Sequence, residues 1–311
     1  MNAATRQVQI GEPHGNVAET RAAGSFVFWT LLALYAVARI LQVYPGKVPM
    51  EAVVALHVFP PAIFAVSHGA KFYRWRGILM FVLIVLVVGN AFENVGVLTG
   101  FPFGHYYFTD LMGPKIFAVP IMLGLAYVGM AYLSWTLARL VLGEGPAPLS
   151  GSRIVTVPLV AGFIMVAWDF SMDPVWATVL RAWVFPGGGA YFGVPISNFA
   201  GWYLTVYVIY QLFALYWRSR ASKSAPLPPA YWRQPVLFYA VSAAGNLLLV
   251  LPQSRFTVVS DPAGTRWRVS DITATCAWVT ILTMGAFALL AWVRLADPKP
   301  TVEPRDLESN D

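Results

Sequence analysis

The chain has 311 residues, of which 58% are hydrophobic and only 12% are charged. Soluble domains carry about 25% charged residues, so this composition excludes an ordinary soluble protein and predicts a polytopic membrane protein. The net charge is +6, but the basic residues are spread between apolar runs rather than clustered, which argues against nucleic acid as a partner.

Apolar runs of about 20 residues, long enough to cross a bilayer, recur along the chain. They predict an all-α membrane helix bundle with seven or eight transmembrane helices, in a single domain over residues 25–295. The candidate spans are residues 25–44, 50–69, 77–98, 114–142, 154–173, 194–217, 235–252 and 272–295. Part of the long fourth span is expected at the membrane surface. The fifth is expected to end at Asp173, because the residue before a proline is pushed out of helical geometry.

The flanking residues and the loops predict the orientation. The polar segments 1–24 and 296–311 are expected to be disordered tails. With eight spans, loops on the side of the N-terminus hold more Lys and Arg than the opposite loops. The positive-inside rule therefore predicts that both tails are cytoplasmic, with the protein in the bacterial cell (inner) membrane.

Glu93 is an acid inside the third predicted span. A carboxylate at bilayer depth costs about 2.5–3.5 kcal/mol on insertion scales, so such residues usually mark functional sites. Asn90, Glu93 and Asn94 share one helical face, where the amides could hold the carboxyl group. An acid that keeps its proton in an apolar pocket can serve as a general acid. The alternative is a structural hydrogen bond between Glu93 and another helix.

Asp169 and Asp173 share one face of the fifth predicted span. Two neighbouring carboxyl groups cannot both ionise cheaply, so such a pair can divide the work of proton donor and water activator. The alternative for Asp173 is a solvated position at the helix end before Pro174.

Irregular segments rich in glycine and proline accompany both acid-bearing spans. Tyr106 and Tyr107 follow the first of them, as is typical of an interfacial aromatic belt, with a cavity-facing tyrosine as the alternative. The run GGGAYFGVPISN at 187–198 contains Ser197 and Asn198, which could point into the same cavity. Asn246, alone in a later apolar run, could complete a polar cluster.

The sequence therefore predicts a site of acids with orienting groups around them. The predicted catalytic residues are Glu93, Asp169 and Asp173. The predicted substrate- or carboxyl-orienting residues are Asn90, Asn94, Tyr106, Tyr191, Ser197 and Asn198. Glu93 or Asp169 is the expected proton donor, with Glu93 slightly favoured because its helix face is more apolar. Asp173 is expected to position or activate water.

No metal or cofactor is expected. His57, His68 and His105 lack carboxylate or cysteine partners at ligand spacing, and no phosphate-cradling or dinucleotide motif is present. Aromatic residues make up 15% of the chain. Besides anchoring the helices, their rings could line a tunnel for a long hydrophobic molecule and stabilise a carbocation.

An internal repeat is suggested by two similar segments, FAVPI at 117–121 and FGVPI at 192–196. Glu93 and Asp169 precede them at nearly the same distance. If the two helix pairs start on the same side of the membrane, the repeat is parallel. Chance similarity of so short a match is the alternative.

Three ordered motifs resemble those of the carotenoid 1,2-hydratase and bisanhydrobacterioruberin hydratase family, a family of carotenoid biosynthesis membrane proteins. They are ENVGVLTGFPFGHYY at 93–107, WDFSMDP at 168–174 and YFGVPISNFAGW at 191–202. The resemblance covers roughly residues 25–295, with its specific part in 90–202.

The resemblance implies hydration of the terminal 1,2 double bond of an acyclic or monocyclic carotenoid. An acid protonates C2, a tertiary cation forms at C1, and water attacks C1 to leave a tertiary alcohol. Such a lyase needs no cofactor. Its expected partners are the carotenoid substrate, membrane lipid and other enzymes of the carotenoid pathway.

Two alternatives to hydration remain open at this point. A membrane carotene cyclase of the lycopene type starts with a related protonation but must keep its cation dry. A proton-coupled carrier of a hydrophobic molecule would also use intramembrane acids and a repeat, although no inverted repeat is visible in the sequence.

Overall fold

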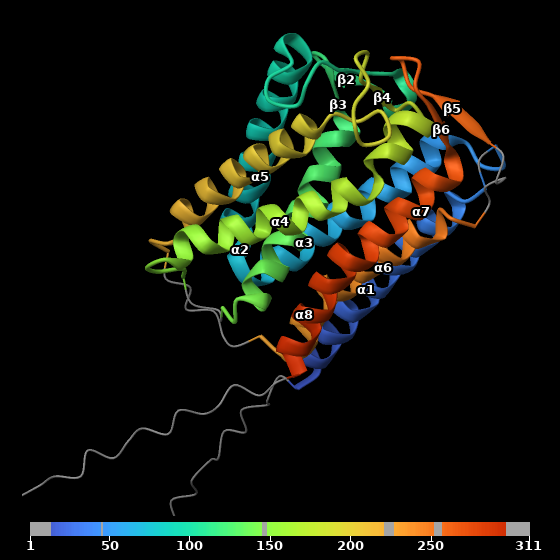
Figure 1. The fold of residues 1–311 in the computed structure, drawn as a ribbon. Coiled ribbons are helices and arrows are strands. Elements are labelled where there is room, and N and C mark those ends of the chain that lie inside the picture. The colour runs from blue at the N-terminus through green and yellow to red at the C-terminus, as the bar shows by residue number, and fades with distance from the viewer. Residues whose placement is uncertain (1–13, 45, 145–147, 221–226, 252–256, 297–311) are drawn as a thin grey trace, which may run out of the picture.

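A computed structural model describes residues 14–44, 46–144, 148–220, 227–251 and 257–296. The predicted tails lie outside the described residues, apart from residues 14–24 and Ala296. The described chain is mostly helical, and its helices lie side by side in one bundle (Figure 1). Within it, five helical segments are long and apolar enough to cross a membrane. The predicted all-α membrane class is therefore confirmed.

Helix α1 (His14–Leu41) begins inside the predicted N-terminal tail, so the prediction of disorder through residue 24 is wrong for residues 14–24. That segment contains Ala, Glu and Arg, which favour helix and extend the apolar part of α1 toward its N-terminus. α1 packs against α2 (Met50–Thr99) and α6 (Pro229–Leu248).

α2 is interrupted at Arg74, whose backbone (φ 57°, ψ 169°) is not helical. This residue lies between the second and third predicted spans. Arg74 and Arg76 are both exposed, as expected for charges at a membrane surface. An unbroken helix of 50 residues would be about 75 Å long, more than twice the thickness of the hydrocarbon core.

α3 (Ile121–Val141) is shorter than the predicted fourth span. Residues before it form a hairpin of β2 (Lys115–Ile116) and β3 (Val119–Pro120). Pro120 is the N-cap of α3. Proline is tolerated there because it has no N–H to donate, and the residue that precedes a helix needs none for the helical hydrogen bonds.

α4 (Arg153–Pro174) continues into a π turn at Val175–Val179. The α-helix thus ends at the predicted Asp173–Pro174 position, but the chain stays helical through Val179, so the prediction that the span stops there is wrong. The wider π turn accommodates Pro174, whose ring removes one backbone donor from the regular helical ladder. Asp173 is fully buried, so its solvated alternative does not apply.

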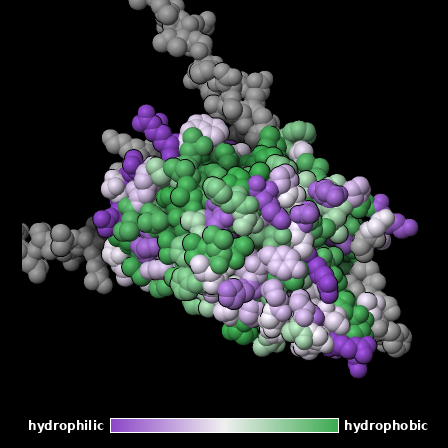
Figure 2. Space-filling view, turned by 90° about the horizontal axis from the view of Figure 1, so that it is seen from above, coloured by the Kyte–Doolittle hydropathy of each residue, from purple (hydrophilic) through white to green (hydrophobic). Residues whose placement is uncertain are grey.

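The remaining helices complete the bundle. α5 (Ile196–Trp217) follows the glycine-rich loop, and α7 (Val269–Thr280) continues through a π turn into α8 (Ala286–Ala296). α3 lies between α2, α4, α6 and α8 and is the most deeply enclosed of the long helices. Figure 2 shows a broad apolar area on the surface beside areas of mixed polar residues, as expected for helices in contact with lipid.

Short strands connect the loops at one end of the bundle, which we call the ribbon end (Figure 1). β1 (Tyr107–Phe108) pairs with β4 (Trp183–Val184), and β5 (Val258–Ser260) pairs with β6 (Arg266–Arg268). The predicted all-α class therefore does not extend to these loops, which contain short two-stranded pairs. Backbone N–H and C=O groups of loops near a membrane have little water to bond with, and pairing of two short strands supplies their hydrogen bonds.

The two copies of the predicted repeat share several backbone features, although Gly193 is left-handed (φ 90°) and its equivalent Ala118 is not. Phe117 (φ 55°) and Phe192 (φ 51°) occupy equivalent left-handed positions in two-residue turns. Equivalent residue pairs close these turns, namely Ile116–Val119 and Tyr191–Val194. A proline N-cap and a long helix, α3 or α5, then follow in each copy. The structure supports an internal repeat rather than a chance match.

Phe108 of β1 and Trp183 of β4 are also equivalent positions of the two copies, and they pair with each other. Their antiparallel register joins Tyr107 with Val184 and Phe108 with Trp183. Because Phe108 and Trp183 are equivalent residues that pair in antiparallel strands, a pseudo-two-fold axis relates the α2–α3 half to the α4–α5 half. Residues of the two halves therefore meet near this axis.

Candidate functional site

All three predicted acids are buried in the bundle. Glu93 comes from the second half of α2, and Asp169 and Asp173 come from α4, each near the C-terminal end of its helix. α2, α3, α4 and α5 pack against one another around them, toward the ribbon end (Figure 1).

Both carboxyl oxygens of Glu93 accept a hydrogen bond from a tyrosine. Tyr127 of α3 donates from its hydroxyl to Oε1 at 2.6 Å, and Tyr106 donates to Oε2. Burial, and then the charge of Glu93, raise the pKa of the Tyr106 phenol, so that it remains a neutral donor. Two such donors stabilise a negative charge on Glu93.

Asp173 also accepts two hydrogen bonds. The indole Nε1 of Trp183 donates to Oδ1 at 2.6 Å, and the Nδ2 of Asn198 donates to Oδ2 at 2.7 Å. The same Nδ2 lies 3.5 Å from Oδ2 of Asp169. Oδ1 of Asp169 is buried without a hydrogen-bond partner in the described structure. Donors are therefore concentrated on Asp173 within this pair.

A stacked pair of rings lies beside Glu93. Tyr127 and Trp202, equivalent positions of the repeat, stack with their centroids 4.5 Å apart and their planes within 5°. Beside them is a cavity of about 20 Å³, lined among others by Glu93, Trp183 and Asn198. That volume holds about one water molecule. We call it the water-sized cavity.

An apolar cleft between α2 and α3 reaches Glu93 from the outside of the bundle. Its volume is about 440 Å³, within the range of small-molecule sites. Val87, Ile116 and Ile121 line it and are exposed on the bundle surface. Glu93 and Asn90 supply polar atoms in a largely apolar wall. A hydrophobic ligand can thus reach an acid from the lipid side.

A third cavity, of about 60 Å³, lies deeper among α1, α2, α3 and α4, and we call it the interior cavity. Trp168, Trp176, Trp183 and Trp202 all contribute to its wall. Leu123 lines the cleft, the water-sized cavity and the interior cavity, so the three spaces converge on this side chain.

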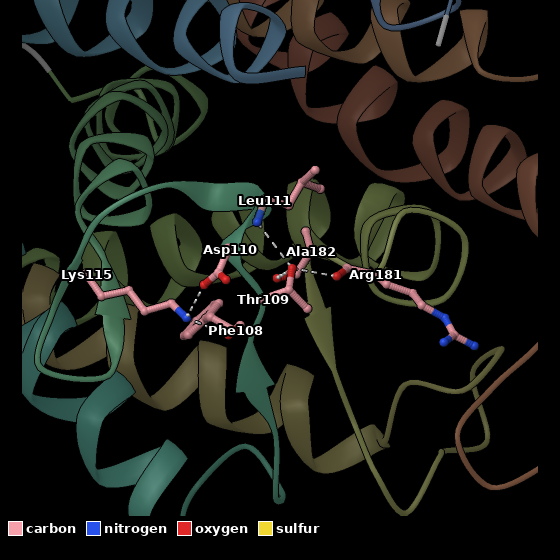
Figure 3. A network of polar contacts seen from close by, with 7 residues as sticks. All are labelled: Phe108, Thr109, Asp110, Leu111, Lys115, Arg181 and Ala182. Atoms are coloured by element: carbon pink, nitrogen blue, oxygen red, sulfur yellow. Dashed lines mark hydrogen bonds and ion pairs between the residues drawn. The ribbon is translucent and has the colours of Figure 1, made fainter. Parts of the chain in front are cut away.

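The ribbon-end loops that carry Tyr106 and Trp183 are joined by hydrogen bonds (Figure 3). The Thr109 hydroxyl lies 2.8 Å from the carbonyl oxygen of Arg181 and 3.2 Å from that of Ala182. Together with the β1–β4 pairing, this contact fixes the donor to Glu93 relative to the donor to Asp173.

Asp110 lies in the same loop region but outside the buried site. Its side chain is fully exposed and forms a 3.3 Å ion pair with Lys115, whose Nζ also donates to the carbonyl oxygen of Phe108 (Figure 3). Exposed ion pairs contribute at most about 1 kcal/mol. Asp110 is therefore an acid at the same end of the molecule that can serve as a control.

Comparisons with known proteins identify the family of the chain. A family described as carotenoid biosynthesis protein matches residues 49–256, more than half of the chain. The chain belongs to this carotenoid biosynthesis protein family. Bisanhydrobacterioruberin hydratase of Haloarcula japonica is 31% identical over 125 residues, which cover 39% of this chain and 39% of that relative. No solved structure matches the chain.

The predicted family resemblance is thus confirmed, and the matched range includes all three acids. In this carotenoid biosynthesis protein, two predicted orienting residues lie on carboxyl groups: Tyr106 on Glu93 and Asn198 on Asp173. Tyr106 therefore faces the site, whereas Tyr107 is exposed as an interfacial residue.

Other predicted orienting residues hold the backbone instead of a carboxyl group. Asn94 donates to Asn90 and accepts from the backbone N–H of Ala118, which ties α2 to the turn before α3. Helical spacing correctly placed Asn90 and Asn94 together, but it could not show which partner the amide would choose. Asn90 lines the cleft.

Tyr191 and Ser197 also bind carbonyl oxygens. The Tyr191 hydroxyl donates to Phe170 at 3.3 Å, and the Ser197 hydroxyl donates to Phe103 at 3.1 Å. Both contacts fasten the glycine-rich loop to neighbouring segments. Asn246 lies apart from the acids on α6, so the prediction that it completes their polar cluster is wrong.

Three aromatic residues of the site were missed by sequence reasoning, namely Tyr127, Trp183 and Trp202. A single Tyr or Trp in an apolar run is typical of core or interface packing, and nothing local marks it as a partner of an acid. The repeat offers a signal in retrospect, because it aligns Tyr127 with Trp202.

His68 has a packing role in the described structure. His68 lies between the Tyr132 hydroxyl (2.6 Å) and the carbonyl oxygen of Tyr231 (3.0 Å). Among the described residues, no group of three or more His, Cys, Asp or Glu side chains could hold a metal ion.

Proposed function

We propose that this protein is a membrane-embedded carotenoid hydratase that adds water across the terminal 1,2 double bond of an acyclic or monocyclic carotenoid end group. One observation carries the proposal. Glu93, held by two tyrosine hydroxyls, lines both an apolar cleft that opens toward lipid and a cavity of water size. An alkene and a water molecule can thus meet at one acid.

Glu93 is the proposed proton donor to C2 of the end group. As the proton leaves, the carboxyl group becomes an anion that is already hydrogen-bonded to Tyr106 and Tyr127. Donors fixed in place before the reaction stabilise developing charge without reorganisation. The tertiary cation at C1 then lies near the stacked rings of Tyr127 and Trp202, whose π faces attract positive charge.

Water in the water-sized cavity is the proposed nucleophile. Asp173 engages the Nδ2 of Asn198, which leaves the amide carbonyl of Asn198 to accept a hydrogen bond from that water. Asp173 thereby positions Asn198. The proton that the water releases on attacking C1 returns to the Glu93 carboxylate, which lines the same cavity, so the acid is regenerated. Asp169, poorly supplied with donors, is proposed as the neutral partner of the pair.

The proton and the water account for the whole reaction, so no cofactor is included in the proposal. Carotenoid and membrane lipid are the proposed partners, with other carotenoid pathway enzymes as further ones. A lycopene-type cyclase shares the first step, but its cation must be kept from water. The water-sized cavity beside Glu93 favours hydration over cyclisation.

Tyr127→Phe is expected to lower the rate of hydration by about 10-fold or more. A hydrogen bond to a charged group is worth about 1.5–3 kcal/mol, and this one, although already formed, reaches that strength only when Glu93 has lost its proton. The ring and its stacking on Trp202 remain. As a matched control, Tyr210→Phe removes a buried hydroxyl that donates to the carbonyl oxygen of Ala131, and its activity should stay within about 2-fold. Equal losses in both variants would contradict the proposed role.

Eight membrane crossings with cytoplasmic termini are the proposed topology, with α2 crossing twice around Arg74. The break at Arg74 and the exposed charges beside it support this count. The test uses protein in which the buried Cys276 is replaced by alanine. In this background, Arg74→Cys should react with an impermeant thiol reagent only from the cytoplasmic side, and Asp110→Cys only from the opposite side. Labelling of both positions from one side would overturn this arrangement.

Expression in a host that accumulates an acyclic carotenoid tests the function itself. A hydratase yields pigment heavier by one water per end group, a cyclase yields an isomer of unchanged mass, and a carrier leaves the pigment unaltered. Mass analysis of the extracts separates the three outcomes.

A further inference from the structure

Arg39 of α1 is a buried charge that the proposed hydration does not use. Its side chain is 4% exposed, although it lies in an apolar helix. In the described structure it forms no ion pair with a carboxylate. An unneutralised guanidinium inside a membrane bundle is costly, and residues of this kind usually serve a function.

α6 is shaped to receive this guanidinium. Nη2 of Arg39 donates to the carbonyl oxygen of Ser242 at 3.1 Å and to Oδ1 of Asn246. A Cβ atom at Gly245 would lie 2.7 Å from the Cβ of Arg39, so a larger residue there would displace the arginine. Both hydrogen-bond partners are neutral, and a guanidinium has five N–H donors, so its capacity to bind a further acceptor is not exhausted.

Arg39 and His57 line one part of the interior cavity, and the tryptophans of the acid site line another. A series of ring contacts joins the two parts. His57 packs edge-to-face on Trp176 at 6.2 Å, and Trp176 stacks on Trp183 at 6.1 Å. Trp183 donates in turn to Asp173. The interior cavity therefore has Arg39 in one part of its wall and, in another, the tryptophan that donates to Asp173.

We propose that the interior cavity is a second polar subsite, in which Arg39 donates a hydrogen bond to an oxygen atom, hydroxyl or carbonyl, carried by the hydrophobic ligand. This inference rests on the proposed function, because the ligand would place its double bond at Glu93. Leu123 borders both the cleft and the interior cavity, so the two spaces meet at this side chain, and the proposed ligand extends past it from Glu93 toward Arg39. A pure hydrocarbon offers the guanidinium no acceptor, whereas an oxygenated chain does. The protein should therefore prefer an oxygenated ligand.

Binding can be measured without turnover, because a bound polyene quenches the tryptophans that line the interior cavity. The probes are an acyclic hydrocarbon carotenoid and its analogues with one hydroxyl or one carbonyl group. Full-length protein in detergent should bind at least one oxygenated analogue roughly 10-fold more tightly than the hydrocarbon, as one hydrogen bond to a charged group allows. The better analogue identifies the kind of oxygen to which Arg39 donates.

Arg39→Met should remove this preference and leave hydrocarbon binding within about 2-fold. Arg181→Met, at an exposed arginine of the ribbon end, is the matched control and should keep the preference. If the wild-type protein binds the hydrocarbon and the oxygenated probes with equal affinity, the subsite is overturned without any variant. An equal loss of affinity for all probes in Arg39→Met would also overturn it, because it would indicate that the arginine is structural. If binding shows the preference but no probe is hydrated, the proposed function fails while the subsite stands.

Discussion

Glu93→Gln is expected to reduce carotenoid hydration by about 10²–10⁴-fold, the usual contribution of general acid catalysis. Glutamine has nearly the same shape as glutamic acid and can still accept from one of the two tyrosine hydroxyls, Tyr106 or Tyr127. What it lacks is a transferable proton. The measurement is conversion of an acyclic carotenoid by purified protein, with size-exclusion behaviour and thermal unfolding in detergent as checks of the fold.

Asp110→Asn is the matched control for this variant. It removes an acid at the same end of the molecule, but the Asp110 side chain is fully exposed. Its activity should stay within about 2-fold of the wild-type protein. Near-normal hydration by folded Glu93→Gln protein would show that Glu93 is structural and would end its assignment as donor.

Asp173→Asn is expected to lower hydration by about 10–100-fold while leaving partial activity. The new amide places an N–H group opposite Asn198 or Trp183, both of which donate to Asp173, so one of these hydrogen bonds must be lost. The water is then poorly oriented, but the proton donor remains. Ser171→Ala, which removes a neighbouring buried hydroxyl bonded to the carbonyl oxygen of Ala167, should have little effect on the rate.

Deuterium exchange separates the two roles. A carotenoid protonated at C2 that fails to capture water can return to the alkene with solvent hydrogen incorporated. In heavy water, Asp173→Asn should therefore still label the recovered substrate, whereas Glu93→Gln should not. Labelling lost equally in both variants would mean that Asp173 is needed for proton transfer itself.

Much of the fold was predictable because the bilayer restricts it. The apolar runs identified the helices, and the charges near Arg74 identified the break within α2. Errors arose where a local rule competed with tertiary packing. Pro174 was expected to end a helix, but a π turn absorbs it. The segment 14–24 was judged by its polarity, although its residues favour helix.

The acids were predictable for a simple energetic reason, since a carboxyl group inside an apolar span needs an explanation. Their partners were less so. Tyr127, Trp183 and Trp202 approach the acids only because the two halves of the repeat meet at a pseudo-two-fold axis. Asn94 and Ser197 looked like site residues but bind nearby backbone, because small polar side chains find loop N–H and carbonyl groups readily.

The central claim is that water is added to a carotenoid end group at Glu93, and isotope-labelled water tests it most directly. Purified protein would be incubated with an acyclic carotenoid in water enriched in oxygen-18, and the pigment would then be analysed by mass. The account predicts a tertiary alcohol that contains oxygen-18 with the wild-type protein and almost none with Glu93→Gln. An isomer of unchanged mass, or unaltered pigment with well-folded wild-type protein, would contradict it.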